Sequence, residues 1–119
     1  MDIINITELK TKLESFAKAR DWEKFHNPKN IAMALSAESG ELLEIFQWLT
    51  PEESAAIKHN SHEFTRVQHE IADIVLYAVL LCHVLGINLQ ESLQQKFAIN
   101  DQKYPPALVK GSAKKPVST

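Results

Sequence analysis

Residues 70–85 of this chain are EIADIVLYAVLLCHVL, and this stretch decides the fold. From Ile74 to Leu85 almost every position is apolar, so a helix here is apolar nearly all round and must be covered on several sides. At its start, Glu70 and Asp73 stand three residues apart, which places both carboxylates on one face of the helix. The stretch therefore predicts a buried helix that carries two acids. A four-helix chain of this size can barely cover such a helix alone, so we expect a second copy to pack against it.

A second acidic pair with the same spacing, Glu38 and Glu41, lies in another apolar segment. If the two helices pack together, four carboxylates converge, and buried carboxylates are costly unless they are paired or bound to a metal. Carboxylate oxygens are the ligands that Mg²⁺ and Mn²⁺ prefer. The sequence therefore predicts a divalent metal site made of Glu38, Glu41, Glu70 and Asp73.

Other features in and between the acidic helices leave alternatives open. Glu44 follows Glu41 by three residues and is a further ligand, a water-activating base or an exposed acid. We favour a base or a residue that supports the metal ligands from behind. Gly40 lies inside a helix, where close approach of another helix or a ligand would explain it. A di-iron site needs Glu-x-x-His on two helices, which these pairs lack. His59 and His62 have the spacing of a zinc pair, but they flank a predicted helix break.

The composition sets the class of protein. The chain has 119 residues, enough for one domain, and its net charge of -2 argues against an electrostatic nucleic-acid binder. One cysteine, Cys82, excludes an intrachain disulfide and fits a reducing compartment. The N-terminus lacks the features of a signal peptide, and the apolar stretch of roughly residues 74–87 is too short to span a bilayer. We expect a soluble, cytoplasmic protein with no membrane or nucleic-acid partner.

The pattern is helical throughout, which predicts an all-α, four-helix-bundle-like fold. Asn or Thr followed by Pro or Glu marks helix starts, and Gly86 marks a helix end. The expected helices run from about residue 5, from 28 to about 49, briefly from 51, from about 61 to 85, and from 88 to about 104. Pro105-Pro106 should end regular structure, so we expect a domain over 1–106 and a flexible basic tail over 107–119.

Four segments resemble a known family, the MazG-like all-α nucleoside triphosphate pyrophosphohydrolases. They are RDWEKFHNPKN (20–30), AESGELLEIFQW (37–48), EIADIVLY (70–77), and the stretch from Lys96 through Asn100 to Tyr104-Pro105. The resemblance covers roughly residues 7–110. The acidic motif is moderately specific by itself and strongly specific together with the two tryptophan-bearing segments.

The resemblance implies an activity and a set of site residues. Family members hydrolyse a nucleoside triphosphate between the α and β phosphates, and the best match is to members that act on dCTP or modified dCTP such as 5-methyl-dCTP. The resemblance implies Mg²⁺, or Mn²⁺, on the four acids already selected. Our own catalytic candidates are Glu41 and Glu44. It implies nucleotide contacts from Trp22, His26, Asn30, Trp48, Tyr77, Lys96 and Asn100. It also implies a homo-oligomer, dimer or tetramer, and a role in cleansing the nucleotide pool.

Other interpretations remain open at this point. Trp22 and Trp48 could fill the core, His26 could cap a turn, and Lys96 could be a solvated helix charge. A broader or dUTP-directed activity, a non-catalytic nucleotide-binding module and a plain structural bundle are the alternative functions. Leu13 stands where a polar residue reaching toward the site would be expected, and this puts the base preference in question.

Overall fold

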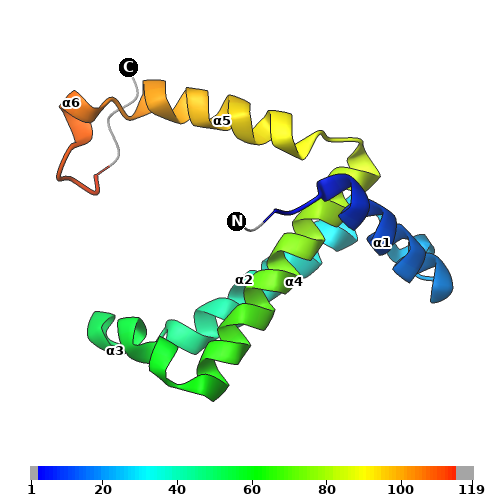
Figure 1. Ribbon diagram of the computed structural model, residues 1–119, viewed down its shortest axis with the longest axis horizontal. Coiled ribbons are helices and arrows are strands. Elements are labelled where there is room, and N and C mark those ends of the chain that lie inside the picture. Colours follow the sequence, from blue (N-terminus) through cyan, green and yellow to red (C-terminus); the bar gives the residue numbers. More distant parts are fainter. Residues whose placement is uncertain (1–2, 115–119) are drawn as a thin grey trace. The chain divides into compact units, whose positions relative to one another are not determined.

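The computed structural model describes residues 3–114, and every regular element in that range is a helix (Figure 1). The α-helices are α1 (Ile6–Ala19), α2 (Pro28–Phe46), α3 (Pro51–Ala55), α4 (Ser61–Leu85), α5 (Leu89–Lys103) and α6 (Pro106–Val109), and the 3-10 helices are η1 (Glu23–Phe25) and η2 (Ala56–His59). The predicted all-α class is therefore confirmed. The chain divides into two compact units, residues 1–86 and 87–119.

In the first unit, α2 and α4 lie side by side, and α1 packs on α4 (Figure 1). This pairing brings the two apolar, acid-bearing helices together, as the sequence predicted. The buried side chains come from all three helices: Ala17, Ile31, Ile45, Val79, Leu80 and Cys82. The core is therefore the seam between α4 and its two neighbours.

Local capping explains where most of the helices begin. The side-chain oxygen of Asn27 accepts from the backbone N–H of Asn30 at 2.9 Å, and Pro28 occupies the first turn of α2. Thr50 and Glu53 form a reciprocal capping box at the start of α3. Asn60 caps α4 as Asn27 caps α2, because its side-chain oxygen accepts from the backbone N–H of Glu63. The break predicted between residues 59 and 62 is therefore confirmed.

The long helix α4 ends at a glycine in the left-handed conformation. Gly86 has φ +69, which an L side chain rarely adopts, and its N–H bonds the last turn of the helix. The helix has 25 residues, more than the apolar stretch of 74–87 that we considered too short to span a bilayer. By length and composition alone α4 could cross a membrane, a test that the core helix of a soluble protein also passes.

Two predicted boundaries differ from the structure. Helix α2 ends at Phe46 rather than near Leu49. Thr50, which precedes Pro51, takes the extended conformation that such a position favours, so α2 cannot continue into α3. Regular structure does not end at residues 105–106, because Pro106 is tolerated in the first turn of a helix and begins α6. Of the expected flexible tail, residues 107–109 are helical and residues 115–119 lie outside the described part of the chain.

The expected covering of α4 is incomplete within the first unit. Val79 and Leu80 are buried, but Val75 and Leu85 are 40% and 52% exposed. Ile71, at the turn before Val75, is exposed as well. One copy of residues 1–86 therefore leaves apolar side chains of this helix in contact with solvent.

Candidate active site

Three of the four predicted metal ligands meet across the α2–α4 seam. Glu38 and Glu41 of α2 and Glu70 of α4 each offer a carboxylate oxygen, and these oxygens lie within 4.8 Å of one another. Glu38 and Glu70 are partly buried, whereas Glu41 is exposed. Asp73 is not part of this group and lies about one turn further along α4, beside a pocket. The packing of two helices thus brings together acids that are far apart in the sequence.

The cluster carries an electrostatic cost. Oε2 of Glu38 and Oε2 of Glu70 are buried and have no hydrogen-bond partner in the structure. The pKa of Glu38 is raised from 4.5 to about 7, first by a hydrogen bond that its protonated form shares with Glu70, then by burial, and then by Glu41. A bound cation would give these carboxylate oxygens a partner and would favour their ionised form, so the cluster has the properties that suit a cation site.

A neighbouring arginine does not relieve this cost. Arg66 stands four residues before Glu70 on α4, a spacing that permits an ion pair. Its guanidinium instead bonds both carboxylate oxygens of Glu63, at 3.1 and 3.0 Å. The Arg66 side chain is therefore already paired with Glu63.

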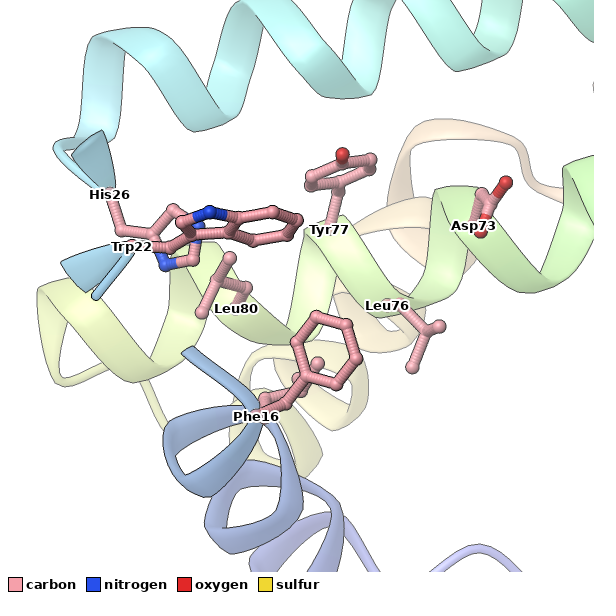
Figure 2. A pocket seen from close by; sticks show the side chains of 8 residues that line it. Phe16, Trp22, His26, Asp73, Leu76, Tyr77 and Leu80 are labelled. Carbon is pink, nitrogen blue, oxygen red and sulfur yellow. The ribbon is translucent and has the colours of Figure 1, made fainter. Parts of the chain in front are cut away.

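Asp73, three residues after Glu70 on α4, lines a pocket of about 280 Å³ (Figure 2). Asp73 and Tyr77 lie one turn apart on α4, and Trp22 and His26 lie at the end of the pocket away from Asp73. The lining residues are Leu13, Phe16, Trp22, His26, Asp73, Leu76, Tyr77 and Leu80. Its volume is just below the range of about 300–1,000 Å³ found for pockets of drug-sized ligands, so it suits a single ring system.

The end of α1 sets the position of Trp22. Asp21 adopts a left-handed conformation, φ 55, which reverses the chain after the helix. The Trp22 N–H then bonds the Ala17 carbonyl at 2.9 Å, and its ring meets the Phe16 ring edge-on with centroids 5.8 Å apart. The indole is thereby held at the wall of the pocket.

Asn30 holds the segment that carries His26. Its side-chain amide donates to the Phe25 carbonyl at 3.1 Å, while its backbone N–H is capped by Asn27. His26 stands between these anchors and lines the pocket. In the structure Asn30 supports this loop, and it is not among the residues that line the pocket.

The other predicted residues are not among those that line this pocket. Trp48 is 86% exposed, in the turn after α2. Glu44 is exposed, one turn after Glu41. Lys96 and Asn100 lie on α5, in the second unit. Within residues 3–114, no group of three possible metal ligands includes the histidines at 59 and 62.

Four lining residues were not selected as site residues from the sequence. Leu13 and Phe16 on α1, and Leu76 and Leu80 on α4, have the spacing of ordinary core residues. Two kinds of signal were available: Leu13 stands where a polar residue reaching toward the site is expected, and Leu76 and Leu80 flank Tyr77 on the helix that carries Asp73. Their role depends on α1 crossing α4 at this point, which local periodicity does not specify.

Comparison with known proteins places the chain in a family. The MazG-like family matches residues 33–115, and the chain belongs to that family. It is 40% identical over 98 residues to bovine dCTP pyrophosphatase 1 and 38% identical over 100 residues to the human protein of that name, covering 82% and 84% of this chain. A solved pyrophosphatase from Archaeoglobus fulgidus is 38% identical, with a TM-score of 0.75, over 88% of this chain and 96% of that one.

The chain spans 58–59% of the length of these mammalian relatives. The residues that match the family, 33–115, include all of α4 and the part of α2 that carries Glu38 and Glu41. Membership of the family implies a divalent metal ion, and the cluster of Glu38, Glu41 and Glu70 offers oxygens that fit it.

Proposed function

We propose that the protein is a Mg²⁺-dependent nucleoside triphosphate pyrophosphohydrolase. Its substrate is dCTP or a modified dCTP such as 5-methyl-dCTP, its products are the monophosphate and pyrophosphate, and its role is to cleanse the nucleotide pool. The observation that carries the proposal is the meeting of Glu38, Glu41 and Glu70 beside a pocket with aromatic walls. The names of the mammalian relatives and of the archaeal structure support the substrate and the reaction.

Four acids would hold the metal: Glu38, Glu41, Glu70 and Asp73. Mg²⁺, or Mn²⁺ in its place, would offset the charge of the triphosphate and help to orient it. Glu38 and Glu70 bring buried oxygens without partners, and these favour a cation of high charge. Asp73 lies between the cluster and the pocket, so it suits a ligand on the side of the substrate.

Glu41 and Glu44 are the proposed catalytic residues. Both are exposed and lie one turn apart on α2, so water can reach them. Glu44 is outside the cluster of three close carboxylates, which leaves its oxygens free of that mutual repulsion. The exposed carboxylate of Glu44 can therefore accept the proton of the attacking water, whereas Glu41 helps to position that water.

The nucleotide would extend from the acids into the pocket. The Trp22 ring offers a face for base stacking, and His26 and Tyr77 offer polar atoms at the pocket wall. Asn30 acts by fastening the loop of His26. For Trp48, Lys96 and Asn100 the proposal rests on the family motifs: stacking by the indole, phosphate neutralisation by the ammonium group and hydrogen bonding by the amide.

We also propose a soluble, cytoplasmic homo-oligomer, a dimer or a tetramer. Exposed apolar residues on α4, such as Ile71 and Val75, support burial against a second copy. Trp48 and Leu43, 86% and 62% exposed near the end of α2, add to the apolar surface. Neither a nucleic acid nor a membrane is part of the proposal, which fits the net charge of -2.

The test is pyrophosphate release from the eight common NTPs and dNTPs and from 5-methyl-dCTP, with Mg²⁺ and with EDTA. We expect Mg²⁺-dependent release that is fastest with the deoxycytidine nucleotides. Release from nucleotides of many different bases at similar rates would replace the proposal with a broad activity. Fastest release from dUTP, added to the panel, would replace it with a dUTP-directed one. Thermal stabilisation by dCTP without any release would indicate a binding module instead.

A further inference from the structure

The pocket beside the acidic cluster has polar and apolar sides. Among its lining residues, polar atoms come from Asp73, Tyr77, His26 and the indole N–H of Trp22. The α1 side contributes only Leu13 and Phe16, and Leu76 and Leu80 of α4 complete the apolar lining. A ring bound here therefore meets hydrogen-bonding groups on some sides and only carbon atoms on the α1 side.

The apolar side is held firmly in place. The Arg20 guanidinium lies 3.6 Å from the centroid of the Phe16 ring and donates to the Phe16 carbonyl at 3.1 Å. The Trp22 ring packs edge-on against Phe16. Leu13, three residues before Phe16, shares its face of α1 and is partly buried. The α1 wall is thus preorganised, so it can select a ligand by shape and polarity.

The direction of the nucleotide follows from the proposed function, on which this inference rests. The triphosphate lies at the acids, so the base extends from Asp73 toward Trp22 and His26, the far end of the pocket (Figure 2). A pyrimidine has one polar edge, with N3 and the C4 substituent, and one apolar edge, C5–C6. Turning the polar edge to the α1 wall would bury hydrogen-bonding groups without partners. The C5–C6 edge therefore faces α1.

We propose that Leu13 is a specificity-determining residue that reads the substituent at C5 of the pyrimidine. With Phe16 and Leu76 it forms an apolar wall that accepts hydrogen or methyl at C5 and disfavours a polar group such as hydroxymethyl. Burying one methyl group favours 5-methyl-dCTP over dCTP by roughly fourfold in kcat/KM. A hydroxymethyl group, left without a partner at the wall, lowers kcat/KM by roughly tenfold.

The test compares dCTP, 5-methyl-dCTP and 5-hydroxymethyl-dCTP as substrates of the full chain and of Leu13→Asn. Asparagine is close to leucine in shape and supplies a hydrogen-bonding group to the wall. We expect the kcat/KM ratio of the methyl to the hydroxymethyl substrate to fall by roughly tenfold or more. Leu9→Asn is the matched control, one turn earlier on α1, equally partly buried and outside the pocket lining, and should leave the ratio unchanged.

A second variant keeps the inference testable if Leu13→Asn does not fold. Leu13→Ala shortens the wall without adding polarity, so 5-propynyl-dCTP should gain relative to 5-methyl-dCTP by at least severalfold. Ratios that match the unmodified protein in either folded Leu13 variant would overturn the inference and leave the proposed function intact. Absence of turnover of every deoxycytidine triphosphate by the unmodified protein would instead overturn the proposed function.

Discussion

Glu38 of α2 and Glu70 of α4 place carboxylate oxygens within 4.8 Å of each other across the helix seam, and Oε2 of each is buried without a partner. Both helices carry these acids among apolar residues, so water cannot solvate them fully. The packing that forms the core of the first unit therefore also creates its strongest local repulsion. A divalent cation would convert that repulsion into attraction, which links stability, pH and metal binding in this protein.

Stability without metal should fall as the pH rises. The pKa of Glu38 is about 7 in the folded chain against an ordinary value of 4.5, so between these values the folded state binds more protons than the unfolded state. The free energy of unfolding therefore decreases with pH across this window: the contribution of Glu38 is complete below 4.5 and is lost through about 7. We expect Tm, measured by calorimetry in EDTA, to decrease from pH 4.5 to 8.

Glu38→Gln is the control for this pH dependence, because the amide cannot ionise. The slope of Tm against pH should become shallower in this variant. An unchanged slope would mean that other groups govern it. Added Mg²⁺ should raise the Tm of the unmodified protein more at pH 8 than at pH 5.5, since the metal binds the ionised carboxylates.

Removing a metal ligand should abolish turnover while the fold survives. Glu41→Ala and Asp73→Ala each delete one carboxylate from the proposed metal site, and neither residue belongs to the buried core. We expect loss of Mg²⁺-dependent pyrophosphate release with unchanged helical circular dichroism. In EDTA the Glu41 variant should unfold at a slightly higher temperature, because like-charge repulsion decreases. Glu52→Ala, an exposed acid on α3, should retain activity, and near-normal rates in either ligand variant would contradict the metal-site assignment.

A base and a ligand should respond differently to an amide substitution. Glu44→Gln removes a proton acceptor outside the cluster of three close carboxylates, so kcat should fall by roughly 10²–10⁴-fold while the Mg²⁺ concentration needed for half-maximal rate stays the same. Glu41→Gln should instead raise the Mg²⁺ requirement. Full activity of Glu44→Gln would assign this residue to the exposed surface, as one of the interpretations of the sequence allows.

Gly40 and Gly86 should have opposite effects on stability when each is changed to alanine. Gly40 lies within α2, and a Cβ added there meets nothing within 4 Å, so Gly40→Ala should raise the free energy of unfolding by about 0.5–1 kcal/mol. Gly86 has φ +69, so Gly86→Ala should lower it by about 1–2 kcal/mol. Urea denaturation measures both. Destabilisation by Gly40→Ala would reveal a second copy packed beside α2.

Helix positions were largely predictable because the signals are local. Asn27, Asn60 and Asn88 each cap the helix that follows, and Gly86 ends α4, all within one turn of the boundary concerned. The errors arose near prolines. Before Pro51, Thr50 is extended and α2 has already ended at Phe46, whereas Pro106 began a helix where we expected regular structure to stop. Proline permits both outcomes, and neighbouring contacts select between them.

The sequence by itself determined the helical class, the family and the acids that share a helix face, because helical spacing places Glu38 with Glu41 and Glu70 with Asp73 whatever surrounds them. Only the tertiary structure decided that Glu38, Glu41 and Glu70 converge while Asp73 turns to the pocket. It alone also decided that Leu13 and Phe16 form a wall of that pocket. A helix period specifies which residues share a face, but the neighbour that this face meets depends on how separate helices cross, and that is a property of packing.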